Sequence, residues 1–203
     1  MSALGRLAPF AREWQPVARP GERCDGCGTP LDDEHHRHLV DLDRSALRCV
    51  CDACRPLASE DRYRLVPTRI LTDPTFILDE ARWSALEIPV RLAFVYFSSR
   101  LGRWAAFYPS PAGAAESLLP MEGFSALAAA TGLVNAAAPD VEALLVHGDR
   151  ESRFETFLVP IDLCYQLVGQ VRLYWRGFSG GDRAWRELET FFADLRSRAE
   201  VLG

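Results

Sequence analysis

Five of the six cysteines in this 203-residue chain lie between residues 24 and 54, and four of them form two Cys-x-x-Cys pairs. Cys24 and Cys27 form the first pair, Cys51 and Cys54 form the second, and 23 residues separate the pairs. Each pair can turn both sulfurs toward one point, and four thiolates complete a closed tetrahedral metal site. The spacing therefore predicts that these four cysteines are metal ligands.

Zinc is the metal that this pattern favours, and iron is the alternative. Rubredoxin uses two turns of the same kind, generally with a glycine after each cysteine pair. In this chain Gly28 follows the first pair, but Arg55 and Pro56 follow the second. Both metals accept a tetrahedral four-sulfur site. Because four thiolates leave no open position for a reacting ligand, we expect a structural role for the metal.

A fifth cysteine and three histidines lie close to these ligands in the sequence. Cys49 precedes Cys51 by two residues, so in a strand it points to the same side. We interpret Cys49 as a small buried residue, with a redox or ligand-exchange thiol as the alternative. His35, His36 and His38 form a cluster in which the last two share a strand face. An exposed polar face is the simpler interpretation of these histidines, and a second metal site or the replacement of a cysteine ligand is the alternative.

A β-hairpin between the two cysteine pairs would position the four thiols. Residues 36–42 and 46–51 have the character of strands, and residues 43–45 between them are a turn signal. A hairpin with one cysteine turn before it and another at its end is a zinc ribbon. We therefore expect a zinc-ribbon-like module over residues 21–58, after a flexible or docking segment over residues 1–20.

The remaining residues, 59–203, predict an α+β domain in which an antiparallel sheet is covered by helices. Residues 88–98 are apolar on both faces of a strand, which predicts a central position in the sheet. A helix with period 3.6 from residue 160 places Cys164 in the core. The other expected elements are strands at 63–66, 103–108, 141–147 and 153–159, a short helix capped by Asp79, and helices at 120–131, ended by Gly132, and at 182–201.

Motifs of catalysis are scarce in this sequence. It has no H-E-x-x-H motif, and without lysine it cannot form a lysine Schiff base. Residues 108–117 have the small side chains of a ligand-binding loop, although an ordinary strand-to-helix connection is the simpler interpretation. Nothing in the sequence brings together any two of the acids Glu116, Asp140, Glu142 and Asp162. We expect a non-enzymatic protein, with ligand binding or catalysis at residues 108–117 as an alternative.

Charge and hydropathy narrow the classes of partner and location. The chain has 23 basic residues, all of them arginine, and 28 acidic residues, which gives a net charge of −5. We expect no binding to nucleic acid, because neither half of the chain has an excess of positive charge. No apolar run approaches the roughly 18 residues of a membrane span, and the first 20 residues lack the apolar stretch of a secretion signal. We therefore expect a cytoplasmic protein.

Several short motifs lie along the chain from about residue 20. They are Cys24-Asp-Gly-Cys27-Gly-Thr-Pro-Leu31, His36-Arg-His-Leu-Val-Asp41, Cys49-Val-Cys-Asp-Ala-Cys54, Trp83-Ser-Ala-Leu-Glu-Ile-Pro-Val90, Tyr108-Pro-Ser-Pro-Ala-Gly113, Val159-Pro-Ile-Asp-Leu-Cys-Tyr165 and Trp175-Arg-Gly-Phe178. On these motifs, nearly the whole chain from about residue 20 resembles a family of uncharacterised bacterial proteins, which are often encoded beside high-affinity uptake NiFe hydrogenases and their maturation factors. The resemblance implies an accessory role in hydrogenase assembly, with a NiFe hydrogenase or a maturation factor as partner. If the metal is iron, it implies electron transfer. It implies no catalytic residues.

Overall fold

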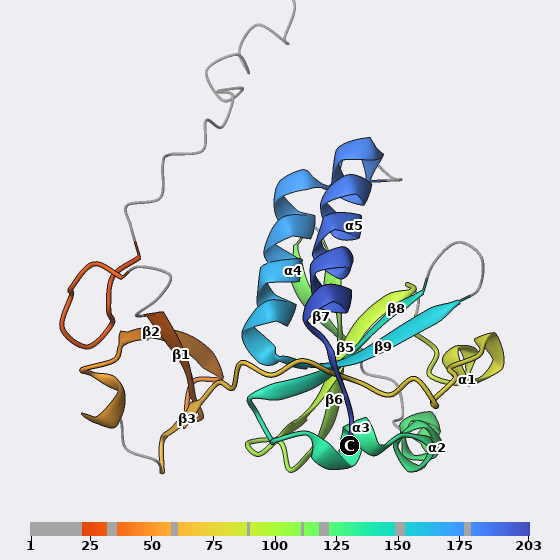
Figure 1. Ribbon diagram of the computed structural model, residues 1–203, viewed down its shortest axis with the longest axis horizontal. Helices are drawn as coiled ribbons and strands as arrows, with labels where there is room; N and C mark the ends of the chain where they lie inside the picture. The colour runs from red at the N-terminus through yellow and green to blue at the C-terminus, as the bar shows by residue number, and fades with distance from the viewer. Residues whose placement is uncertain are drawn as a thin grey trace, which may run out of the picture.

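The computed structural model contains a small sheet and a large sheet that pack side by side (Figure 1). The segment over residues 1–20, expected to be flexible or to dock, lies outside the described residues, and so does His35. The structure describes residues 22–31, 36–57, 61–88, 90–110, 112–117, 122–148, 153–176 and 180–203.

The small sheet contains the hairpin predicted between the two cysteine pairs. Strands β1 (His36–Asp41) and β2 (Ala46–Cys51) are antiparallel, and Ser45 takes a positive φ of 50° in the turn between them. Strand β3 (Tyr63–Leu65) pairs with the other edge of β1, so the order is β2-β1-β3. The short 3-10 helix η3 (Arg55–Leu57) follows the second cysteine pair. The pairing of His36 with Cys51 places the start of β1 beside the end of β2, so the segments that carry the two cysteine pairs leave the hairpin at the same end.

The large sheet has seven strands in the order β10-β4-β9-β8-β5-β6-β7. All of its pairs are antiparallel except β10 with β4, which is parallel. Strand β5 lies in the interior between β8 and β6, as its apolar faces predicted. The strands are β4 (Leu71–Thr72), β5 (Leu92–Ser98), β6 (Arg103–Ser110), β7 (Gly113–Ser117), β8 (Glu142–Gly148), β9 (Phe154–Pro160) and β10 (Glu200–Val201).

Helices cover both faces of the large sheet, which confirms the predicted α+β class (Figure 1). Helices α4 and α5 cover one face, where they pack on Phe94 of β5. Helices α1, α2 and α3 cover the other face, where Ala93 and Val95 of β5 are buried. The predicted core position of Cys164 is confirmed, because its side chain is fully buried. The helices are α1 (Glu80–Ser84), α2 (Glu122–Ala130), α3 (Gly132–Ala136), α4 (Ile161–Tyr174) and α5 (Gly181–Arg198).

Three local expectations are wrong. Gly132 does not end a helix but begins α3, because the Thr131 hydroxyl caps that helix by accepting a hydrogen bond from a backbone N–H two residues later. Residues 108–117 are not a loop but include the end of β6 and the whole of β7, which pair with each other. Where the two strands meet, the Ser110 hydroxyl donates a hydrogen bond of 2.8 Å to the Gly113 carbonyl. The last helix ends at Arg198, and the chain then forms β10.

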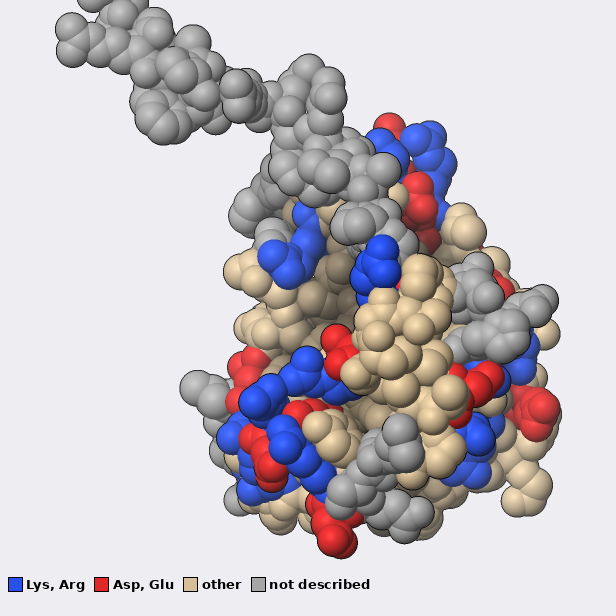
Figure 2. Space-filling model, turned by 90° about the vertical axis from the view of Figure 1, so that its left-hand side faces the viewer, with Lys and Arg blue, Asp and Glu red and all other residues tan. Residues whose placement is uncertain are grey.

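Within the described residues, no helix combines the length and the apolar character that a membrane crossing requires. Basic and acidic side chains are interspersed on the side of the molecule that carries the small sheet (Figure 2). This mixture gives that side no single dominant sign of charge.

The two sheets are joined through an apolar contact and through ion pairs. Val40 of β1 and Leu47 of β2 belong to the same apolar cluster as Ile161, the first residue of α4. Arg64 of β3 lies 2.9 Å from the Asp140 carboxylate, just before β8. The small sheet is therefore held against the large domain at the N-terminal end of α4 and near the start of β8.

Arg69, in the connection between the sheets, donates two hydrogen bonds of 2.7 Å to the Glu142 carboxylate. Glu142 is fully buried at the start of β8, whereas the Arg69 side chain is 47% exposed. The Ala138 backbone N–H is a further donor to this carboxylate, at 2.9 Å. Because the Glu142 carboxylate is buried away from water, these three hydrogen bonds replace the water molecules that it loses on folding.

We expect Arg69→Ala to lower the free energy of unfolding by about 2 kcal/mol, because it leaves a buried carboxylate without its cation. The cost stays below that of a fully buried pair because Arg69 is half exposed. Urea denaturation followed by circular dichroism measures the change. The matched control is Arg103→Ala, which breaks the exposed pair with Glu116 and should cost less than about 1 kcal/mol. Equal losses in the two variants would contradict this account.

Candidate metal centre

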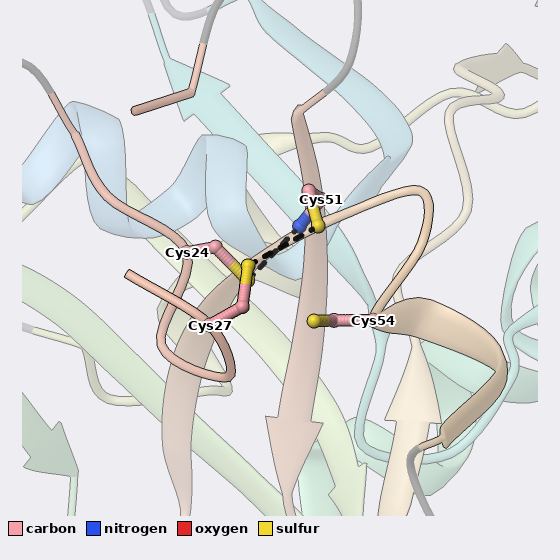
Figure 3. A group of neighbouring side chains, drawn as sticks. All are labelled: Cys24, Cys27, Cys51 and Cys54. Carbon is pink, nitrogen blue, oxygen red and sulfur yellow. Dashed lines mark hydrogen bonds between the residues drawn. The ribbon is translucent and has the colours of Figure 1, made fainter. Parts of the chain in front are cut away.

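The fold brings together the four thiols that the sequence predicted as ligands. Cys24 and Cys27 come from the loop before β1, Cys51 ends β2, and Cys54 lies between β2 and η3 (Figure 3). Their four Sγ atoms all lie within 4.8 Å of one another. The hairpin thus carries one pair at each end and folds the two pairs onto a single point.

The spacing of the sulfurs fits a tetrahedral ion. With metal–sulfur bonds of about 2.3 Å, sulfurs at the corners of a tetrahedron are about 3.8 Å apart. The Sγ atoms of Cys27 and Cys51 are 3.8 Å apart. Four thiolates are a donor set that both zinc and iron accept. The four residues could therefore hold one ion with little rearrangement of the chain.

Backbone N–H groups favour a thiolate at the buried end of the cluster. The N–H groups of Gly26 and Cys51 each donate to the Cys24 Sγ at 3.4 Å. Burial opposes ionisation of Cys24, but these donors and the Cys27 N–H outweigh it and lower its pKa to about 6. The Thr29 hydroxyl, 3.3 Å from the Cys27 Sγ, lowers the pKa of that thiol too.

Cys54 has the opposite electrostatic environment. Hydrogen bonds to the neighbouring sulfurs of Cys27, Cys24 and Cys51 hold the proton on Cys54 and raise its pKa to about 12, and burial and the charge of Cys24 add to this effect. In the absence of a cation, the cluster therefore readily loses a proton at Cys24 and resists losing one at Cys54. A divalent cation removes this resistance, and its binding displaces the remaining protons.

Two glycines allow the first turn to approach the second. A Cβ on Gly26 would lie 3.1 Å from the Cys54 Sγ and 3.3 Å from its Cβ, which is closer than ordinary packing allows. Gly28 has a φ of +75°, a left-handed conformation that side chains disfavour. Gly26 is thus a spacing residue of the cluster, and Gly28 closes the turn after Cys27.

We expect Gly26→Ala to weaken zinc binding by about tenfold, or about 1.4 kcal/mol, because the added methyl group displaces the Cys54 thiol. Competition against a chromophoric zinc chelator measures the affinity. Gly169→Ala is the matched control, since a Cβ on this α4 residue meets nothing within 4 Å. The control should bind zinc as the wild type does, and an unchanged affinity of Gly26→Ala would contradict the role given to Gly26.

A family model described as "Family of unknown function (DUF5947)" matches residues 23–199, from just before Cys24 to the end of α5. The chain belongs to the DUF5947 family. No curated protein and no solved structure matches the chain. Both cysteine pairs and the whole large sheet up to β9 lie inside the region that the DUF5947 model covers, so the candidate metal centre is part of the matched region. The role in hydrogenase assembly stays a prediction.

Cys49 does not join the four-cysteine cluster but lies with His36 and His38, and one ligand atom from each of the three is within 4.8 Å of the others. Burial raises the pKa of the Cys49 thiol to about 11. The two histidines are not an exposed polar face, because their side chains are only 14% and 27% exposed. Sequence reasoning missed Glu22, which contacts His36, and it singled out Asp162 without placing it beside His38.

The acids that the sequence singled out do not form a pair. Each lies against a cationic or histidine partner on a different element, as expected for structural carboxylates. The pairs are Glu116 with Arg103, Asp140 with Arg64, Glu142 with Arg69, and Asp162 with His38.

The first part of segment 108–117 lines a cavity of about 250 Å³. Its lining includes Tyr108 and Pro109, together with Trp175 directly after α4 and Trp185 of α5. The His147 ring at its edge stacks on Phe192, and burial lowers its pKa. The lining suits an apolar small molecule, and binding of such a ligand stays a prediction.

Proposed function

We propose that this DUF5947 protein is a zinc-binding accessory protein, in which a four-thiolate zinc ion fixes the small sheet and the chain acts through contacts with other proteins. The observation that carries the proposal is the convergence of four Sγ atoms within 4.8 Å, contributed by both ends of one hairpin. A closed four-sulfur site is the usual form of structural zinc. It has no position at which a substrate could bind.

The size of the small sheet supports a structural role for the ion. Among the described residues, its own buried apolar cluster consists of Cys24, Leu39 and Val50. So few buried side chains contribute little stability to a hairpin. An ion that ties the turn before β1 to the turn after β2 adds its binding free energy to folding.

The mixed surface charge supports protein partners over polyanions. Arginine and acidic side chains alternate over the side that carries the small sheet (Figure 2), whereas a nucleic-acid surface needs a continuous excess of positive charge. The partner that we propose is a NiFe hydrogenase or one of its maturation factors. The support for this identity is the resemblance of the cysteine motifs and of four later motifs to proteins encoded beside such hydrogenases.

We expect the full chain, purified without added metal, to carry zinc and to show no visible absorption band. Elemental mass spectrometry should find one zinc fewer per chain in Cys54→Ala than in the wild type. Cys164→Ala is the matched control, because it removes a thiol from the core of the large domain and should keep the wild-type zinc content. One iron per chain with a visible thiolate-to-iron band would instead support the alternative of a rubredoxin-like electron carrier. Equal metal content in wild type and Cys54→Ala would contradict both.

We also expect the tagged full chain, purified from a host that contains a NiFe hydrogenase, to retain a hydrogenase subunit or a maturation factor. Quantitative mass spectrometry should show at least a tenfold enrichment over the Cys54→Ala variant, because loss of the ion loosens the small sheet. The Cys164→Ala variant should retain the partner. A wild-type eluate without these proteins would contradict the proposed partner and leave the zinc centre standing.

A further inference from the structure

A second group of metal-ligating side chains lies on the same hairpin as the four-cysteine cluster. His38 and Cys49 are directly opposite each other in the β1–β2 register, and His36 is two residues along β1 on the same face. One nitrogen of each imidazole and the Cys49 Sγ all lie within 4.8 Å of one another. The two rings meet edge to face with centroids 4.3 Å apart. Three good transition-metal donors thus converge.

A carboxylate lies beside the Nδ1 atom of each histidine. The Asp162 Oδ2 is 2.7 Å from the His38 Nδ1, and the Glu22 Oε2 is 3.3 Å from the His36 Nδ1. A carboxylate beside Nδ1 favours the tautomer that carries its hydrogen on Nδ1, and in that tautomer the lone pair of the ring is on Nε2. Histidines that bind metals have this arrangement, in which a carboxylate orients the ring and strengthens its donor nitrogen.

The His36 Nε2 atom is buried and has no hydrogen-bond partner among the residues that the structure describes. A buried polar atom without a partner costs about 1–3 kcal/mol. No described protein group offsets that cost at this nitrogen, whereas a bound metal ion would. This unpaired nitrogen is the observation that distinguishes the group from an ordinary pair of packed histidines.

The backbone of Cys49 is held by the first cysteine turn. The Cys49 N–H donates to the Asp25 carboxylate at 2.9 Å, and the Asp25 N–H donates to the Cys49 carbonyl at 2.8 Å. Asp25 lies between Cys24 and Cys27, so folding of that turn also places the Cys49 thiol. The donor atoms are therefore positioned by the β1–β2 pairing, by Asp162 of α4 and by the turn that contains Asp25.

We propose that His36, His38 and Cys49 form a second transition-metal site, for a divalent ion such as zinc, with one coordination position open to water or another ligand. Two imidazoles and a thiolate suit metals of intermediate softness. Three protein ligands with an open fourth position are the pattern of reactive zinc, in contrast to the closed four-sulfur cluster. The His38 side chain is 27% exposed, which gives an ion access from solvent. The proposal uses none of the four clustered cysteines and goes beyond the function proposed above.

The test adds Co²⁺ to the full chain after the four-cysteine centre has been filled with zinc. We expect one further equivalent to bind, with visible absorption typical of tetrahedral cobalt and a thiolate-to-cobalt band in the near ultraviolet. His38→Gln and Cys49→Ala should lose this equivalent and its spectrum while they keep the zinc of the first centre. His147→Gln, which replaces a histidine on the large sheet, should bind cobalt as the wild type does.

Asp162→Asn distinguishes a positioned metal site from accidental cobalt binding. We expect it to weaken cobalt binding by about 10- to 100-fold and to leave the stoichiometry unchanged at saturation, because the carboxylate orients His38 without binding the ion. A wild-type chain that takes up no cobalt beyond zinc exchange would overturn the proposal. Unchanged uptake in both His38→Gln and Cys49→Ala would do the same. Failure of the first centre would show instead as zinc content that Cys54→Ala does not reduce.

Discussion

Mutual repulsion of four thiolates is the constraint on which the small sheet depends. Sulfurs within 4.8 Å of one another cannot all ionise unless a cation shares their charge. Backbone N–H donors favour the thiolate at Cys24, with a pKa of about 6, whereas the neighbouring sulfurs hold the proton on Cys54, with a pKa of about 12. The glycine at position 26 and the N–H donors around Cys24 bring the thiols closer than an uncompensated cluster would favour. The local chain geometry therefore fits a cation site, which the paired strands of the β1–β2 hairpin position.

The large domain supplies the second support of the hairpin. One side of the small sheet carries the cysteine cluster, and Val40 and Leu47 pack into the apolar cluster at the start of α4. Arg64 and Arg69 then fix the third strand and the connection to acids around the start of β8. These contacts place Asp162 of α4 against His38. The histidine group therefore exists only where the two sheets meet, and its geometry depends on both.

The features that the sequence could predict were those set by residues close together in the chain. The Cys-x-x-Cys spacing, the hairpin, the central position of β5 and the burial of Cys164 follow from the periodicity of short segments, and the structure contains each of them. The neighbours of the histidines depend on contacts between distant segments, since 124 residues separate His38 from Asp162. Strands β4 and β10 have two residues each, too few for any pattern, and form through pairing alone. Strand alternation grouped Cys49 with Cys51, but β2 ends at Cys51 and its thiol turns to the other cluster.

The two metal-ligating groups share one structural element, and this links their chemistry. Asp25 belongs to the turn that carries Cys24 and Cys27, yet its carboxylate and N–H hold the backbone of Cys49. On the two proposals made above, loss of an ion from the four-cysteine centre would loosen that turn and release the Cys49 thiol from its position. A closed centre that fixes the chain would then be a precondition for an open centre that exchanges ligands.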